Sequence, residues 1–261
     1  MNEYTDKQFW NEYYQKKYRP KIIDKVVFAD IFEKYLTPDP DKEILEIGCA
    51  GGDLLCFLAK QYHFKTFGVD YSDEIKTTVE LFRFNSLPTP TLFKQDIFKW
   101  RPGRQFDLVC SFGLLEHFEN PAPLLQKHIE LLKPGGTLII TMPHFAHLQY
   151  FFHWLIDRDN LKKHNTGIMS IGAIKKAVAG FSLEIEYLNY YRTFGFWTER
   201  PNDHNPLLAK EGLGRSPLAW WERLIYHSIQ FSGRVINKLL GPHHPNPLVS
   251  PHLVLIAKKL A

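Results

Sequence analysis

The stretch from Glu43 to Leu55, EILEIGCAGGDLL, constrains the fold of this chain more than any other. A short apolar run stops at Gly48, and a helical pattern begins after Gly52. Glycines here allow the backbone conformations that a close approach to a ligand requires, and the free N–H groups of the next helix point to the same place. The stretch predicts a strand, a glycine-rich turn and a helix that together bind a nucleotide-like ligand.

The spacing of the glycines argues against a dinucleotide, whose binding turn has the pattern G-x-G-x-x-G. Counting from Gly48, the second and third glycine positions hold Ala50 and Asp53. A carboxylate there disfavours phosphates, whereas it is compatible with a ligand without phosphate, such as S-adenosylmethionine (SAM). Asp70 ends the next predicted strand, 65–70, near the spacing at which a carboxylate binds ribose hydroxyls.

These residues resemble the class I SAM-dependent methyltransferases, in which the loop after the first strand reads E/D-x-G-x-G-x-G and an acidic residue ends the second strand. Here the loop positions hold Glu46, Gly48, Ala50 and Gly52. Ala50 departs from the pattern, and its methyl group narrows the room beside the cofactor without closing it. The resemblance implies that SAM is the cofactor and that Asp70 binds its ribose.

A second block of sequence extends the resemblance. FDLVCSFG at 106–113 is typical of a fully buried parallel strand. This strand is followed by an E-H pair, a helix from near Pro121, L-K-P-G-G at 132–136 and another apolar strand through Thr141. Methyltransferases of the broad ubiquinone- and menaquinone-biosynthesis group show the same order. The two blocks cover about residues 43–143.

The alternation of strands and helices, together with the resemblance, predicts a single α/β domain. We expect a Rossmann-like, seven-stranded, mostly parallel sheet with helices on both faces and an antiparallel last strand. The remaining strands are predicted at 92–96, 182–190 and 251–259. We expect a helical cover over 1–40, a cofactor-binding core over 43–143, and substrate-lid insertions, aromatic or helical, over 144–165 and 191–248.

The resemblance also implies a set of cofactor-binding residues. Asp96, after the third strand, would accept a hydrogen bond from the adenine amino group, and Ile97 or Phe98 would pack on the ring; an exposed loop carboxylate is the alternative for Asp96. Ser72 is also expected to cap the next helix. The expected cofactor-binding residues are Glu46, Gly48, Cys49, Ala50, Gly51, Gly52, Asp70, Tyr71, Ser72, Asp96, Ile97, Phe98, Ser111, Phe112 and Gly113.

His117 is the candidate catalytic base, because it follows the fourth strand, where the methyl group should project, and imidazole titrates in a suitable range. Glu116 beside it is the candidate acid or orienting group. A structural histidine packed beside the cofactor is equally compatible with this position.

The flanking segments supply the expected acceptor-binding residues, although core packing is the alternative for the N-terminal aromatic residues. These residues are Tyr14, Tyr18, His144, His147, Phe151 and Trp154. A helix is predicted over 218–240, with Trp221, Leu224, Ile225, Ile229, Val235, Ile236 and Leu239 on one apolar stripe that walls the acceptor pocket. Dimerisation or membrane contact through this helix is the alternative.

The net charge and the cysteines limit which binding partners and which cellular compartment are expected. The 261 residues carry a net charge of +4 without a concentrated basic run, which does not single out nucleic acid. The three cysteines form no C-x-x-C pair, and neither a signal peptide nor an 18-residue apolar run is evident. His144, His147 and His153 match no standard zinc spacing, so no metal is expected. We expect a cytoplasmic protein without stable membrane insertion, and a homodimer remains open.

The sequence therefore favours SAM-dependent methyl transfer to a small or medium-sized acceptor, with oxygen as the accepting atom in a ring-bearing natural product, quinol or sugar. No N-P-P-Y motif follows the fourth strand. The alternatives are a non-catalytic SAM-binding protein and an N- or C-methyltransferase acting on a lipid-linked acceptor. A dinucleotide-dependent oxidoreductase is disfavoured by Asp53.

Overall fold

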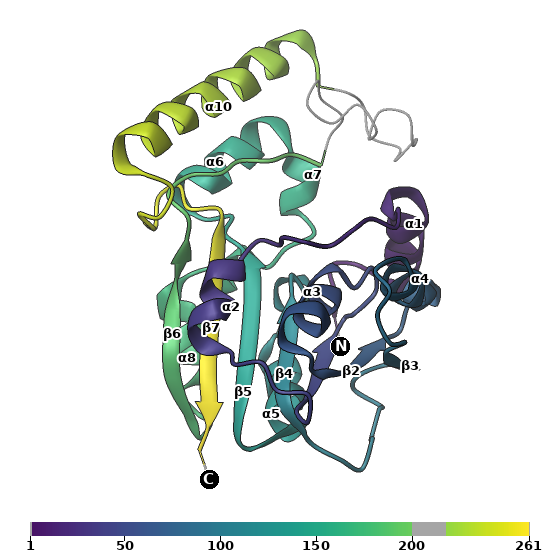
Figure 1. The fold of residues 1–261 in the computed structure, drawn as a ribbon. Coiled ribbons are helices and arrows are strands. Elements are labelled where there is room, and N and C mark those ends of the chain that lie inside the picture. The colour runs from purple at the N-terminus through teal and green to yellow at the C-terminus, as the bar shows by residue number, and fades with distance from the viewer. Residues whose placement is uncertain (1, 200–217, 261) are drawn as a thin grey trace.

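A computed structural model describes residues 2–199 and 218–260 and has at its centre a seven-stranded sheet in the order β3-β2-β1-β4-β5-β7-β6 (Figure 1). The first five strands are parallel, and β7 runs antiparallel to both β5 and β6. The predicted fold is confirmed. The strands are β1 Glu43–Ile47, β2 Lys65–Asp70, β3 Thr91–Lys94, β4 Phe106–Phe112, β5 Leu132–Pro143, β6 Leu183–Tyr191 and β7 His252–Lys259.

Helices cover both faces of the sheet because successive strand residues point to opposite sides. Leu45 packs in a core with residues of α5 and α8, whereas its neighbour Ile44 packs in a second core with residues of α2, α3 and α4. The helices are α1 Lys7–Lys17, α2 Ala29–Tyr35, α3 Asp53–Tyr62, α4 Lys76–Phe84, α5 Ala122–Glu130, α6 His147–Ile156, α7 Arg158–Leu161, α8 Ile171–Val178 and α10 Trp220–Leu240. Three short 3₁₀ turns are η1 Asp73–Ile75, η2 Leu115–His117 and η3 Thr166–Ile168.

Two N-terminal helices form as the sequence predicts. α1 lies beside α4 at the edge of the sheet, and the segment between α1 and α2 crosses above the carboxyl ends of the central strands (Figure 1). The expected cap at Ser72 differs in detail. Ser72 precedes the 3₁₀ turn η1 without a capping side-chain hydrogen bond, because its backbone N–H is turned toward Asp70.

The segment after β5 is helical. Residues 144–165, expected to form an aromatic or helical insertion, contain two helices, α6 and α7. α6 packs under α10 in a third cluster that lies beyond the carboxyl ends of the strands, as Figure 1 shows. That cluster contains Ile156, Phe194, Phe196, Leu218, Tyr226, Ile229 and Val249.

The helix α10 buries only part of its predicted apolar stripe: Ile229 is buried, and Ile225 and Ile236 pack against the third cluster. Its buried residues are Glu222, Tyr226, Ile229 and Gly233. Gly233 allows the Phe194 ring to lie against the helix backbone, where a Cβ would overlap the ring. The stripe residues Trp221, Leu224, Val235 and Leu239 are exposed instead. The rest of the predicted 191–248 lid includes residues 200–217, which lie outside the described residues. Among those described, no helix combines the length and apolarity that crossing a membrane requires.

Candidate active site

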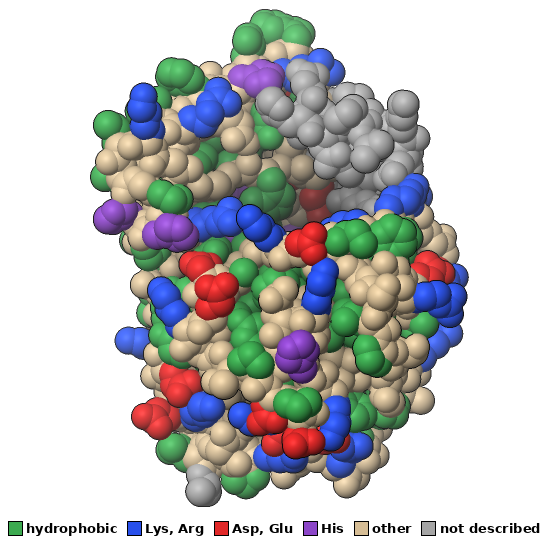
Figure 2. Space-filling view, in the orientation of Figure 1, with side chains coloured by type: hydrophobic (Ala, Val, Ile, Leu, Met, Phe, Trp, Pro, Cys, Tyr) green, Lys and Arg blue, Asp and Glu red, His purple; other side chains and the backbone are tan. Residues whose placement is uncertain are grey.

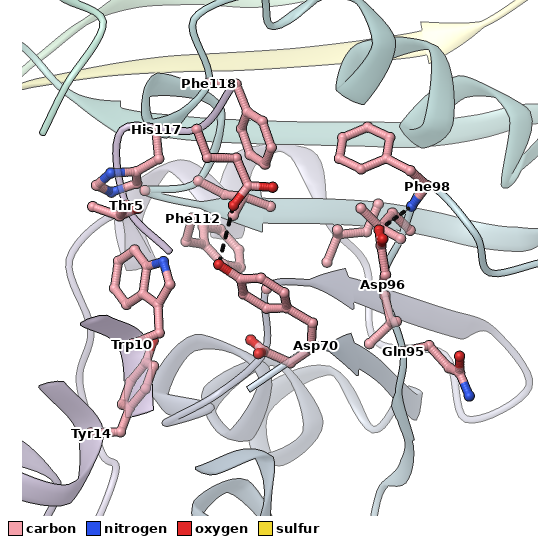
Figure 3. Close-up of a pocket in the computed structure, with 18 residues that line it drawn as sticks. Thr5, Trp10, Tyr14, Asp70, Gln95, Asp96, Phe98, Phe112, His117 and Phe118 are labelled. Carbon is pink, nitrogen blue, oxygen red and sulfur yellow. Dashed lines mark hydrogen bonds between the residues drawn. The ribbon is translucent and has the colours of Figure 1, made fainter. Parts of the chain in front are cut away.

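An inner cavity opens at the carboxyl ends of β1, β2 and β4 (Figure 3). Parallel α/β sheets bind ligands at this edge, where strand ends and helix N-termini converge. The cavity is lined by Glu3, Thr5, Trp10, Tyr14, Ile47, Gly48, Val69, Asp70, Tyr71, Gln95, Asp96, Ile97, Phe98, Phe112, Gly113, Leu114, His117 and Phe118. Strand ends supply its floor, and α1 closes one side through Trp10 and Tyr14.

The glycine turn has the strained geometry that its sequence predicts. Gly48, Gly51 and Gly52 have φ values of 78°, 85° and 67°, which disfavour any residue with a Cβ. A Cβ on Gly51 would lie 2.9 Å from a ring carbon of Tyr14. The turn therefore places backbone atoms without a Cβ at the cavity wall and leaves room for the Tyr14 ring of α1.

Asp70 fixes the turn from the neighbouring strand. Its carboxylate accepts hydrogen bonds from the backbone N–H groups of Ala50, at 3.1 Å, and Ser72, at 2.7 Å. Burial raises the pKa of Asp70, and the backbone donors oppose that rise. The residue joins two loops while lining the cavity.

The far end of the inner cavity is built by the loop after β3. Asp96 lies two residues beyond the strand rather than ending it, and its carboxylate accepts a hydrogen bond from the N–H of Phe98 at 2.9 Å. The Phe98 ring meets Phe118 edge-on, with centroids 5.7 Å apart. The result is an apolar slot with one carboxylate at its rim.

Three predicted cofactor residues line neither the inner cavity nor the recess beside it that is described below. Cys49 is buried against Gly68, where only the missing Cβ leaves room for its sulfur. Ser111 faces α5 instead, where its hydroxyl lies 2.9 Å from Nε2 of His128. Ser72 is also fully buried, and its backbone N–H donates to the Asp70 carboxylate.

Glu46 and the glycine turn form a recess beside the inner cavity, and Tyr14 and Gly48 line both. Burial raises the pKa of Glu46 to about 8, and the nearby Asp70 adds to the rise. Its Oε2 is buried without a hydrogen-bond partner among the described residues. An orphaned carboxylate oxygen of this kind is a site for a donor on a ligand. Ala50, Gly51, Gly52 and Tyr18 also line this recess.

An outer cavity of about 590 Å³ adjoins the inner one, and Phe112 and Gly113 line both. Its walls combine aromatic and polar side chains, and the ring of Trp197 stacks on His252 at a centroid distance of 5.1 Å. Figure 2 shows a hollow between α10 and the sheet, with Lys and Arg side chains along its lower edge. The other lining residues include Lys21, Lys25, Phe28, Asp53, Leu54, Met142, Phe145, Asn160, His164 and Glu199.

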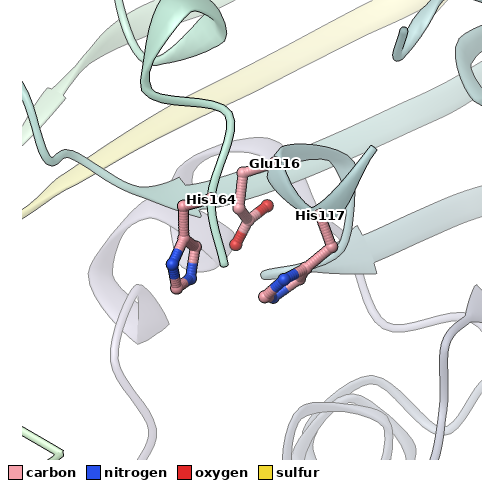
Figure 4. A group of neighbouring side chains, drawn as sticks. All are labelled: Glu116, His117 and His164. Atoms are coloured by element: carbon pink, nitrogen blue, oxygen red, sulfur yellow. The ribbon is translucent and has the colours of Figure 1, made fainter. Parts of the chain in front are cut away.

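Glu116, His117 and His164 converge where the two cavities meet (Figure 4). His117 lines the inner cavity and His164 lines the outer one. The Glu116 carboxylate lies beside Gly113, 3.4 Å from where a Cβ would project. Burial raises the pKa of Glu116 to about 8. Burial also lowers the pKa of His117 well below its ordinary value, as does the neighbouring His164.

Both rings are held in one orientation by backbone carbonyls. Nδ1 of His117 lies 2.9 Å from the carbonyl oxygen of Lys163, and Nδ1 of His164 lies 2.6 Å from that of Asn160. Because a carbonyl only accepts, each Nδ1 carries the hydrogen and each Nε2 keeps its lone pair. The sequence did not predict His164, since it lies 47 residues beyond His117 and in no motif.

The model of one protein family, described as a methyltransferase domain, matches residues 13–188. The chain belongs to this family. It is a class I SAM-dependent methyltransferase by family, and the resemblance that its glycine turn suggested is confirmed.

Relatives and solved structures agree with this membership. Ubiquinone biosynthesis O-methyltransferase from Hydrogenovibrio crunogenus is 31% identical over 115 residues, which are 42% of this chain and 46% of that one. Trans-aconitate 2-methyltransferase from Azoarcus sp. is 26% identical over 106 residues, 40% of each chain. This chain therefore matches about half the length of its curated relatives, or less. YjhP from E. coli superposes with a TM-score of 0.58 at 13% identity, covering 95% of this chain and 97% of that one.

A second solved structure shares the fold. The geranyl diphosphate C-methyltransferase of Streptomyces coelicolor, solved with S-adenosyl-L-homocysteine, superposes with a TM-score of 0.54 at 13% identity. It covers 89% of this chain and 77% of that one. Identities this low show the fold alone, so the acceptor must be argued from the cavity.

The residues of this methyltransferase fit SAM, the cofactor of its family. The glycine turn is a cradle that a Cβ would fill, and the carboxylates of Asp70 and Asp96 line the same cavity. Glu46 offers an orphaned carboxylate oxygen beside the turn. The sequence missed Glu3, Thr5, Trp10 and Gln95, which also line the inner cavity. The aromatic run of α1 was the available signal for Trp10.

The predicted acceptor-binding residues separate in the structure. Tyr14 and Tyr18 lie at the inner cavity and the recess, whereas the other four line neither of the two cavities described above. His144 is buried with Nδ1 2.8 Å from the Ser250 carbonyl oxygen, and His147 is exposed at the start of α6. Phe151 and Trp154 are 49% and 43% exposed, because α6 buries its opposite face under α10.

Proposed function

We propose that this chain transfers a methyl group from SAM to a hydroxyl of a small or medium-sized, ring-bearing acceptor. The observation that carries the proposal is the junction of the two cavities at Phe112 and Gly113. A cofactor in the inner cavity and an acceptor in the outer one would face each other at this point. When bound, SAM supplies a methyl group on a positively charged sulfur, which is already a good electrophile.

Different parts of the cofactor would bind in the inner cavity and in the recess. Asp70 would accept from the ribose hydroxyls, and Asp96 with the Phe98 slot would hold the adenine. Glu46 would pair with the ammonium group of the methionine part, because its Oε2 lacks a partner beside the glycine turn. Ser111 and Cys49 are left out of this set, because their side chains face the core.

The outer cavity favours an acceptor with a ring and a polar substituent. Trp197, which is only partly buried, offers an aromatic face on which a phenol, quinol or sugar ring can stack. Two lysines lie at the rim: Lys21 is ion-paired with Asp53, and Lys25 could meet a negatively charged substituent. A cavity of about 590 Å³ suits a small or medium-sized molecule.

The chain contributes alignment and a polar group at the reacting oxygen. Holding two reactants in line can lower the activation barrier by several kcal/mol. We infer that Glu116 and His117, with His164 from the outer cavity, bind the acceptor hydroxyl and take up its hydrogen. Their position at the junction supports this role.

A lipid-linked acceptor is a second candidate, and the exposed side of α10 favours it. Trp220 and Phe231 are 75% and 62% exposed, and Leu224 and Leu239 lie on the same side. Figure 2 shows apolar side chains along the outer edge of α10 with basic ones beside them, and Arg234 and Lys238 are exposed on this helix. Helices with this composition bind membrane surfaces. Co-sedimentation with anionic vesicles, lost in a Trp220→Ser/Phe231→Ser variant, would select this candidate.

Two measurements test the proposal. Calorimetric titration with S-adenosylhomocysteine and with NADH should show binding of the first and little of the second, and tighter binding of NADH would refute the cofactor assignment. Turnover of SAM on a panel of phenols, quinols and glycosides should reveal an O-methylated product. Tight cofactor binding without turnover on any member would favour the non-catalytic alternative.

A further inference from the structure

The cluster of Glu116, His117 and His164 has the composition of a metal site. One ligand atom from each side chain can be chosen so that all lie within 4.8 Å of one another. Two residues come from η2 after β4, and His164 comes from the segment between α7 and η3. Two imidazoles with one carboxylate are a donor set found at catalytic zinc sites.

The Glu116 carboxylate needs a partner that the described residues do not provide. The residue is only 1% exposed, and its Oε2 has no hydrogen-bond partner among the residues that the structure describes. In Figure 4 the carboxylate points between the two imidazole rings. A buried carboxylate without a donor or cation is costly. Its position between the two rings makes this carboxylate a candidate ligand for a cation.

The two histidines present the atoms that a metal would bind. Their Nδ1 hydrogens are committed to the carbonyl oxygens of Lys163 and Asn160, so each Nε2 lone pair is left for a ligand. Histidines that bind metals usually donate the other ring N–H to a carbonyl or carboxylate, which fixes the tautomer and the ring orientation. Both histidines already have this second partner.

The surroundings favour a cation and restrict access to it. The Lys163 ammonium, the basic group beside the cluster, forms an ion pair with Glu199 at 2.9 Å. The ring of Trp10 meets His117 edge-on at 5.0 Å, and Phe145 meets His164 in the same way at 5.0 Å. His117 lines the inner cavity and His164 the outer one, so the cluster can be approached from the cavities.

We propose that Glu116, His117 and His164 bind a divalent transition-metal cation of the zinc type, with a coordination position open to the acceptor. The cation would bind at the site to which the proposed function assigns the acceptor hydroxyl, and its role in catalysis rests on that function. Binding of the cation itself does not depend on methyl transfer. Divalent zinc, cobalt and manganese accept nitrogen and oxygen donors of this kind. With the metal bound, the three side chains would act as its ligands in place of taking up the proton themselves. The cation would hold the acceptor oxygen beside the cofactor cavity and lower the pKa of its hydroxyl, so that the proton could leave to solvent.

The test is titration of the purified full chain with CoCl₂, followed by visible absorption, and with ZnCl₂ by calorimetry. Wild type should bind one equivalent. Glu116→Gln and His164→Gln should each weaken binding at least about a hundredfold, because loss of even an outer partner of a metal ligand typically costs ten- to a hundredfold. His244→Gln, which removes an exposed imidazole outside the cluster, should bind as wild type does.

Three results would overturn the inference: no stoichiometric cobalt binding by wild type, binding retained in both cluster variants, or binding lost equally in His244→Gln. X-ray absorption of the cobalt-loaded wild type, which needs no variant to fold, should show two imidazole ligands, and a spectrum with none would also refute the site. Titration of the same proteins with S-adenosylhomocysteine separates the two proposals. Cofactor binding without metal binding refutes only the cation, and metal binding without cofactor binding refutes only the proposed function.

Discussion

The Asp70 carboxylate lies 3.1 Å from the backbone nitrogen of Ala50 and accepts its hydrogen bond, which ties the end of β2 to the glycine turn after β1. Its other oxygen accepts from the N–H of Ser72 at 2.7 Å. Asp70 therefore shapes the turn in addition to any contact with the ribose. This dual role explains why an acid stands at the strand end.

Asp70→Asn should weaken binding of S-adenosylhomocysteine by about ten- to a hundredfold, because a hydrogen bond to a charged group contributes about 1.5–3 kcal/mol. The amide retains one acceptor and turns its NH₂ group toward a backbone donor, so the turn loosens as well. Calorimetry measures the affinity. Asp41→Asn, at an exposed position, is the matched control. Unchanged affinity in a folded Asp70→Asn protein would show that the cofactor is held elsewhere.

Gly51→Ala should destabilise the chain and weaken cofactor binding together. The φ of 85° is unfavourable for alanine by about 1–2 kcal/mol, and the new methyl would press on the Tyr14 ring. Thermal unfolding and calorimetry give the two quantities.

Gly172→Ala is the control for that substitution. It lies in α8 with open space around it, so alanine should stabilise the chain by about 0.5–1 kcal/mol. Equal effects of the two substitutions would contradict the geometry inferred for the turn.

The cofactor half of the site could be predicted from sequence because its residues follow consecutive strands. Strand ends meet at one edge of a parallel sheet, so Gly48, Asp70 and Phe112 converge without further information. Side-chain direction could not be read in the same way. Ser111 faces away from the cavity because neighbouring strand residues point to opposite faces, and the sequence does not say which face holds the cofactor.

The acceptor half could not be predicted because it depends on tertiary packing. His164 meets His117 only because α7 folds back over η2, where the Asn165 N–H donates to the Glu116 carbonyl oxygen at 2.6 Å. α10 is apolar on two sides, so periodicity alone could not select the face that Gly233 opens to Phe194. Likewise, Phe151 and Trp154 of α6 are exposed and line neither the inner nor the outer cavity.

Trp197→Ala should raise the KM for the acceptor at least about tenfold, because this ring stacks on His252 and forms a wall of the outer cavity. Trp154→Ala should leave KM and kcat unchanged within about twofold, since its half-exposed ring stacks on Phe151 outside that cavity. Steady-state kinetics with an acceptor from the panel gives both values. The opposite ranking would restore α6 as part of the acceptor site.

His128 should make the folded state sensitive to acid. The ring is fully buried, with Nδ1 2.7 Å from the Leu124 carbonyl oxygen and Nε2 2.9 Å from the Ser111 hydroxyl. Burial lowers the pKa of His128 from 6.5 to about 4. Between these values the unfolded chain binds a proton that the folded chain does not, so stability is greatest above pH 6.5 and falls as the pH drops toward 4.

At pH 5, about 1.5 pH units below the pKa of the unfolded chain, this residue should lower the free energy of unfolding by about 2 kcal/mol. Urea unfolding at pH 7.5 and pH 5 measures it. In His128→Gln the amide can still reach Ser111 but does not titrate, so the variant should be less stable at pH 7.5 and lose less stability on acidification than wild type. His63→Gln, at an exposed position, should keep the wild-type difference between the two pH values. If His128→Gln also keeps the full difference, the acid sensitivity belongs to other buried groups.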